Sequence, residues 1–115
     1  MGSYVPLSGA WAYCAAKSAV VNQTQLLAKE LACFDIRCNA VAPGFFLGKQ
    51  NHRLLVNQDG SLTPRGKAVI DHTPMGRFGE TSELAPAVVF LLSDAASFIT
   101  VITLPVDGGY LCANI

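Results

Sequence analysis

The stretch that decides the fold is Ile36-Arg37-Cys38-Asn39-Ala40-Val41-Ala42-Pro43-Gly44, a short and mostly apolar run that ends in a Pro-Gly pair. A run of this length that stops at a turn signal fits a strand better than a helix. Its apolar character is typical of a strand buried on both faces, as in parallel sheets. The sequence therefore predicts a buried parallel strand over residues Ile36 to Ala42.

A long helix is predicted immediately before this strand, from about Ala10 to Phe34. Apolar residues recur there at helical spacing, which indicates one amphipathic helix whose small residues near its start allow a close neighbour. A helix followed by a parallel strand makes an αβ unit. The residues expected on the buried side of this helix are Ala16, Ala19, Val20, Leu26, Leu27 and Leu31, with Gln23 as a polar exception.

The chain after the strand, from Phe45 to Glu80, breaks into short pieces. A turn is expected at residues 58–61, and Thr63 is suited to cap a helix that has Pro64 at its first position. Insertions of this kind after a sheet strand often cover a substrate, so we expect a lid here.

A second amphipathic helix is expected after the lid, with Thr81 as its cap and Glu83 in its first turn. Pro86 falls just beyond the positions where a missing N–H costs nothing, so we expect a distorted first turn or a later start. The last strand spans about Ile102 to Val106, and Pro105 places it at the edge of the sheet. The expected buried stripe of the helix is Ala87, Val88, Leu91 and Leu92.

The composition limits the classes of partner. The 115 residues suit one small domain, or part of one, and eight basic residues balance eight acidic ones. This balance gives no electrostatic reason to expect nucleic acid or an acidic membrane surface as a partner. Apolar residues reach 51% and charged residues only 14%, below the usual quarter or so, which suggests surfaces that something else covers.

Compartment and redox state follow from what the sequence lacks. No apolar run approaches the eighteen or so residues of a membrane span, and no basic segment followed by an apolar one opens the chain. We expect a cytoplasmic protein without a metal site, because the histidines do not cluster with the cysteines and no Cys-x-x-Cys occurs. Buried free thiols are expected at Cys14, Cys33, Cys38 and Cys112.

Tyr13 and Lys17 stand four residues apart in the predicted long helix, so phenol and ammonium share one helical face. A free tyrosine has a pKa near 10, too high for ready proton exchange at neutral pH, but an adjacent positive charge favours the phenolate. The pair is thus a candidate acid/base. The alternative is an ordinary solvated helix face.

Three segments in this order resemble the C-terminal half of the short-chain dehydrogenases/reductases: Tyr13 to Lys17, Ile36 to Phe45, and Leu104 to Gly109. The resemblance implies an α/β fold, the C-terminal portion of a Rossmann-like doubly wound parallel sheet. Residues 1–115 would form the C-terminal part of a single domain. The Gly-rich phosphate loop of the family's dinucleotide-binding half has no counterpart in this sequence.

The family's catalytic serine precedes the tyrosine by about thirteen residues, a spacing that falls just before Met1. Ser3 and Ser8 lie nearer to Tyr13 than this spacing requires. We interpret both as turn or cap residues, with Ser3 as a substitute serine as the alternative.

The resemblance also implies a chemistry. Tyr13 would pass a proton to or from the substrate oxygen while hydride moves between a substrate carbon and the nicotinamide of NAD or NADP. Lys17 would hold the nicotinamide ribose and lower the pKa of the tyrosine. Pro43, Gly44 and Phe46 would lie along the cofactor. The family's threonine four residues after the glycine is Gly48 here, so that contact is in doubt.

Residues 45–51 and 72–79 are similar to a branch of the family that acts on sugar acids such as the fructuronate/mannonate pair. On this basis the expected substrate is a small molecule with a carboxylate and hydroxyls. The alternative is a solvated loop with Arg77 paired to an acid such as Glu80. The residues that would bind the substrate are Phe45, Lys49, Gln50, Asn51 and Arg77.

Two further expectations concern the C-terminal part. Asp107-Gly108-Gly109 is usually structural in the family, where it turns the chain and supports subunit contacts, and the longer parent would be a homo-oligomer, a tetramer or dimer. Val101 replaces a glycine that the family generally has there. If that turn needs a positive φ, the turn must be rebuilt around valine.

A second interpretation, in which the chain is not an enzyme on its own, stays open. In it the chain is a non-catalytic truncated remnant or a partner-dependent fragment, and the isolated 115 residues are inactive. An in-frame Gly-rich loop and serine upstream of Met1 would favour the enzyme.

Overall fold

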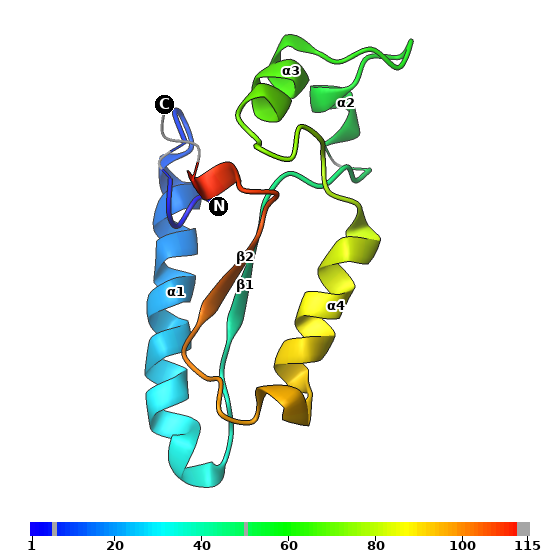
Figure 1. Cartoon of the computed structure of the whole chain (residues 1–115). Coiled ribbons are helices and arrows are strands. Elements are labelled where there is room, and N and C mark those ends of the chain that lie inside the picture. The colour runs from blue at the N-terminus through cyan, green and yellow to red at the C-terminus, as the bar shows by residue number, and fades with distance from the viewer. Residues whose placement is uncertain (6, 50, 113–115) are drawn as a thin grey trace.

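The computed structural model describes residues 1–5, 7–49 and 51–112. Its centre is a two-stranded parallel sheet with a long helix on either side, and a pair of shorter helices beyond one end of the strands (Figure 1). This arrangement confirms the predicted α/β class. The elements are α1 (Trp11–Leu31), η1 (Ala32–Phe34), β1 (Ala40–Pro43), α2 (His52–Leu55), α3 (Pro64–Asp71), α4 (Thr81–Leu92), η2 (Asp94–Ala96), β2 (Thr103–Val106) and η3 (Tyr110–Cys112).

The sheet joins β1 and β2, with Val41 opposite Leu104 and Ala42 opposite Pro105. The ladder includes bonds from the Ala40 N–H to the Ile102 carbonyl and from the Gly44 N–H to the Val106 carbonyl, each 2.9 Å long. Because direction alternates along a strand, Pro105 turns its nitrogen away from β1 and costs the ladder no donor. This agrees with the edge position expected for the last strand.

The first strand starts at Ala40 and not at Ile36, so the predicted start was wrong. Side chains replace the ladder before that point. The Arg37 guanidinium donates to the Leu91 carbonyl (2.6 Å), and the Asn39 amide donates to the Ile99 carbonyl (2.9 Å). The Cys38 N–H donates to the Thr100 hydroxyl at 3.1 Å. The segment is therefore tied to the chain before β2 without being a strand.

Helix α1 confirms the predicted long helix, but its buried face differs from the predicted stripe. Thr24 and Ala28 are buried, whereas Val20, Leu26 and Leu27 are exposed. Thr24 can be buried because its hydroxyl donates to the Val20 carbonyl at 2.9 Å. Small side chains let this face approach its neighbours, and the larger leucines point away from them.

Helix α4 begins one residue earlier than predicted, with Glu80 as its N-cap and Thr81 as its first residue. Pro86 lies inside this helix and causes no break, because the helix runs without interruption from Thr81 to Leu92, so the alternative of a later start was wrong. Leu91 is buried as expected, but Val88 is exposed and Leu92 is 77% exposed, so both were wrongly placed in the buried stripe.

The predicted lid consists of α2 and α3, which stand beyond the carboxyl ends of the strands (Figure 1). Thr63 caps α3 as predicted, because its hydroxyl accepts the Gly66 N–H at 3.0 Å and Pro64 follows at the first position. Leu55, only 1% exposed, is the centre of this unit. A Cβ on Gly66 would collide with the Leu55 carbonyl oxygen, so only glycine fits there.

Val101 has φ +69°, so this position does take the positive φ that suits valine poorly. Its N–H donates to the Cys38 carbonyl at 2.8 Å, which helps to hold the residue in the left-handed region.

The four thiols are free, but Cys33 and Cys112 are exposed and the other two are half-buried, so the prediction of buried thiols was wrong. Among the described residues no helix combines the length and apolar character that crossing a bilayer needs.

Candidate active site

A cleft lies between the first half of α1 and the strand β1. Tyr13 and Lys17 line it from the helix, and residues 40–44 line it from the strand, including Pro43 and Gly44. Met1 and Ser3 add part of the N-terminal segment. In open parallel sheets ligands bind outside the carboxyl ends of strands, and the Pro43 end of this cleft lies at such a place. The structure thus brings four residues of the predicted site into one cleft.

Tyr13 and Lys17 face the cleft because α1 carries them one turn apart. The Lys17 Nζ lies 5.6 Å from the centre of the Tyr13 ring. The ring is 50% exposed, so a ligand can reach the phenol. On its other side the ring lies against Gly2, where a Cβ would come 2.7 Å from Tyr13 Cε1.

Ser3 lines the same cleft as Tyr13. The sequence favoured a turn role for Ser3, and the chain does turn there, since the Tyr4 N–H donates to the Met1 carbonyl at 2.9 Å. The turn and the cleft position coexist. Thr103 also lines the cleft and was missed, because the register of β2 against β1 decides which of its side chains reach it.

Gly44 has a packing reason to be glycine. A Cβ there would lie 2.6 Å from the Asp107 Cα, because the ends of the two strands meet at this point. Glycine therefore allows β1 and β2 to close together at the mouth of the cleft.

A second pocket lies beside the first, on the chain that follows both strands. Phe45, Phe46 and Met75 give it apolar walls, and Arg77 and Glu83 give it a charged one. The Phe46 ring lies against Gly79, whose Cβ would come within 2.6 Å of it. The side chain of Phe46, predicted to lie along a cofactor, thus lines this pocket and not the Tyr13 cleft.

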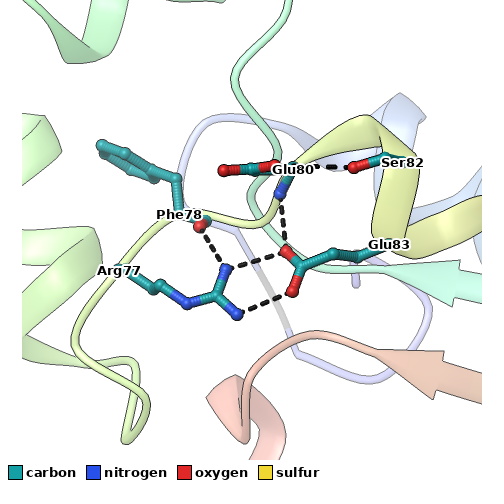
Figure 2. A network of polar contacts seen from close by, with 5 residues as sticks. All are labelled: Arg77, Phe78, Glu80, Ser82 and Glu83. Carbon is teal, nitrogen blue, oxygen red and sulfur yellow. Dashed lines mark hydrogen bonds and ion pairs between the residues drawn. The ribbon is translucent and has the colours of Figure 1, made fainter.

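Arg77 is held by Glu83 in a two-point ion pair, with N–O distances of 2.7 and 2.8 Å (Figure 2). The acid is Glu83 and not Glu80, which instead donates its N–H to Glu83 at 2.8 Å. Hydrogen bonds from Arg77 and from the Glu80 backbone lower the pKa of Glu83 to about 2, and the hydrogen bond to Glu83 raises the pKa of Arg77. A substrate carboxylate would have to compete with Glu83 for this guanidinium.

The remaining predicted substrate residues lie on the loop after Phe46. Asn51 uses both ends of its amide within the loop, accepting the Gly48 N–H at 2.8 Å and donating to the Phe46 carbonyl at 2.7 Å. Lys49 is exposed, and Gln50 lies outside the described residues. Asn51 therefore shapes this loop, while Phe45 and Arg77 line the second pocket.

The Tyr13 cleft suits one end of a nicotinamide dinucleotide. A lysine ammonium and a tyrosine hydroxyl supply donors for a ribose, and the backbone around Gly44 supplies a flat wall. A pyrophosphate needs a glycine-rich turn that opens a helix after a strand, and no described element provides one. The residues thus fit the nicotinamide ribose and not the whole cofactor.

Comparison with known proteins gives a consistent match. A family model described as enoyl-(acyl carrier protein) reductase matches residues 1–111. The chain is 46% identical over 112 residues to UxuB, an uncharacterized oxidoreductase of Bacillus subtilis (strain 168), covering 96% of the chain and 40% of that protein.

Solved structures agree in fold. A protein described as a D-mannonate oxidoreductase from Haemophilus influenza, with bound NAD, has a TM-score of 0.91 and 43% identity over 99% of this chain and 41% of its own. One described as a 2-deoxy-D-gluconate 3-dehydrogenase from Agrobacterium tumefaciens, with bound NADP, has a TM-score of 0.78 and 39% identity. It covers 87% of this chain and 39% of its own. The chain spans about 40% of the length of the proteins it matches.

Proposed function

The chain belongs to the short-chain dehydrogenase/reductase family, and from this we propose that it is the tyrosine and lysine portion of an NAD(P)-dependent oxidoreductase. One observation carries the proposal: Tyr13 and Lys17 line a single cleft with Pro43 and Gly44 at the carboxyl end of a parallel strand. We assign residues 1–115 to the C-terminal part of a single Rossmann-type domain.

The proposed chemistry interconverts an alcohol and a carbonyl. A bound nicotinamide would accept the hydride in oxidation or supply it in reduction. During oxidation the Tyr13 side chain, as the phenolate, takes the proton from the alcohol oxygen, and during reduction the Tyr13 hydroxyl donates that proton to the carbonyl oxygen. The Lys17 ammonium holds the nicotinamide ribose and places a positive charge beside the phenol, and Pro43 and Gly44 form the wall behind the ring.

The proposed substrate is a sugar acid, supported by the D-mannonate and 2-deoxy-D-gluconate assignments of the two solved structures. Lys49 is the exposed cation of the loop after β1 and would attract a carboxylate. Arg77 would contribute if Glu83 were displaced from it. Phe45, Gln50 and Asn51 complete the proposed substrate residues.

The cofactor is proposed to be NAD or NADP, because one of these structures holds NAD and the other NADP. We further propose that the protein is cytoplasmic and that the longer protein to which these residues belong is a homo-oligomer. A second candidate function, a fragment that works only with a partner chain, is favoured by the exposed apolar side chains of α1 and α4.

The test joins residues 1–115 to the N-terminal part of the Haemophilus protein and measures NADH oxidation with sugar-acid ketones. Tyr13→Phe should lower kcat by roughly 100-fold or more, the range of general acid catalysis, while cofactor affinity stays nearly unchanged. Lys17→Met should weaken cofactor binding as well. Tyr4→Phe is the matched control, because Tyr4 lies outside the cleft lining. Turnover of Tyr13→Phe equal to that of the parent would refute the assignment.

A further inference from the structure

The chain after β2 folds into a tight turn over residues 107–112. The Asp107 carboxylate accepts the Gly109 N–H at 2.9 Å and the Leu111 N–H at 3.0 Å. Gly108 and Gly109 have φ +63° and +88°, which only glycine adopts without strain. This geometry folds the chain back and brings the Tyr110 ring beside that of Phe45, which follows β1.

The turn contacts the end of the lid. The Met75 N–H donates to the Gly108 carbonyl at 3.1 Å. A Cβ on Gly108 would lie 3.0 Å from Thr73 Cγ2, so the Thr73 side chain packs against the Gly108 backbone. Thr73 is itself buried, and its hydroxyl donates to the Val69 carbonyl at 2.7 Å. The contact therefore reaches α3 through its last turn.

The Tyr110 ring lies between two other rings. Its centre is 5.1 Å from that of Phe45 and 4.6 Å from that of His72. Both pairs are tilted or edge-on, the arrangements that aromatic rings prefer. Phe45 directly follows Gly44 of the Tyr13 cleft, and His72 ends the lid helix α3. One side chain thus connects the mouth of the cleft to the lid.

The lid does not need Tyr110 to hold its own shape. Leu55 and Val69 are buried, and the Thr63 N–H donates to the Leu55 carbonyl at 3.0 Å. The lid is attached to the strand side by a few bonds, among them one from the Gly79 N–H to the Phe45 carbonyl at 2.9 Å. Loss of the aromatic contact should therefore free the lid as an intact body.

We propose that Tyr110 is a positioning residue that fixes Phe45 against the lid beside the second pocket, so that the C-terminal turn sets the width of that pocket. The role of Tyr110 in shaping a substrate site rests on the proposed oxidoreductase function. The attachment of the lid through Tyr110 does not, and the experiment on it needs neither cofactor nor substrate.

The experiment measures amide hydrogen exchange in the 115-residue chain for Tyr110→Ala and Tyr110→Phe. In Tyr110→Ala the docking amides of Met75 and Gly79 should exchange roughly tenfold faster, as expected for the loss of two aromatic contacts. Amides inside the lid, such as that of Thr63, and those of α1 should be unchanged. Tyr110→Phe should behave as the parent, and Phe34→Ala, which removes an exposed ring outside this contact, is the control.

His72→Ala removes the lid side of the same contact and should give the same exchange pattern. It serves as the test variant if Tyr110→Ala fails to fold. Unchanged exchange at Met75 and Gly79 in the alanine variants would overturn the proposal. So would faster exchange throughout the chain, which would assign Tyr110 to general stability, or a Tyr110→Phe variant that behaves like the alanine one. Loss of activity in the Tyr13→Phe test bears on the proposed function alone.

Discussion

Val101 carries a conformation that suits it poorly. Its φ of +69° lies in the left-handed region, where a β-branched side chain is strained. The residue is exposed, so its side chain gains little from burial in return. The hydrogen bond from its N–H to Cys38 is the contact that holds the strain in place. The turn between η2 and β2 is therefore a local weakness of the fold.

Val101→Gly should stabilise the chain by roughly 0.5–1 kcal/mol. Relief of the left-handed strain contributes about 1–2 kcal/mol, and the greater freedom of glycine in the unfolded chain cancels about 0.5–1 kcal/mol of it. Urea unfolding followed by circular dichroism measures the difference. Val101→Ala, which keeps the Cβ, is the control and should gain much less. Equal stability of the glycine variant and the parent would show that the turn is unstrained.

The Glu83 carboxylate holds the start of α4, together with the Glu80 side chain in a capping box. Glu83 accepts the Glu80 N–H and holds Arg77 with both oxygens, so it joins the end of the lid connection to the first turn of the helix (Figure 2). A carboxylate in the first turn also interacts favourably with the helix dipole. This element therefore depends on the charge state of Glu83.

The pKa of Glu83 is about 2 in the folded chain, below the usual 4.5, so its contribution to stability is present above about pH 4.5 and is lost as the pH falls toward 2. Glu83→Gln should reduce the drop in thermal midpoint between pH 5 and 2.5, since that variant has no carboxylate to protonate. Asp71→Asn is the control, because it breaks an exposed ion pair elsewhere, with Lys67. Parallel pH curves for Glu83→Gln and the parent would contradict this role.

The long elements could be predicted from the sequence, but the contacts between elements, which decide the buried faces and side-chain partners, could not. The helix over residues 11–31 and the strand ending at Pro43 follow from periodicity and turn signals alone. The buried face of α1 depends on which neighbour it packs against, so Thr24 was not predicted as buried. Arg77 was expected to bind substrate, with pairing to an acid such as Glu80 as the alternative, and only the exact start of α4 places Glu83 within its reach. The four-residue α2 is too short for any periodic signal.

The candidate site was predictable in part for the same reason. Tyr13 and Lys17 share a face through local helical geometry, and Pro43 and Gly44 end a strand by their own chemistry. Their meeting in one cleft is tertiary and was supplied only by the family resemblance. The placement of Tyr110 between Phe45 and His72 has no local signal, because the three lie far apart in the chain.

The molecule as a whole is more extended than a compact domain of its length. Its radius of gyration is 16.1 Å, against roughly 13 Å for a compact chain of this size. Few large side chains are fully buried, and apolar ones such as Leu92 and Phe98 lie open to solvent. The free edges of the two-stranded sheet add unpaired backbone groups that attract other strands.

We expect the purified chain to associate, because exposed apolar surface and open strand edges both favour it. Size-exclusion chromatography with light scattering should give a mass above 12.2 kDa, together with a broad thermal transition. Leu92→Ser with Phe98→Ser should shift the distribution toward monomer, and Ser82→Ala is a surface control. A monomeric parent that unfolds in one sharp transition would show that these residues form a self-sufficient domain.

The hydrogen bonds between residues 37–39 and residues 99–102 affect the order in which the elements fold. They join positions about sixty apart, such as Cys38 and Thr100, which are 62 residues apart. On a ribosome β1 would emerge well before its only described partner, while the lid and α4 are still to be made. Pairing over such a distance is slow, because the entropy of closing the loop is lost before any contact rewards it. Nascent β1 would therefore wait unpaired, and the helices, which need only near neighbours, would form around it first.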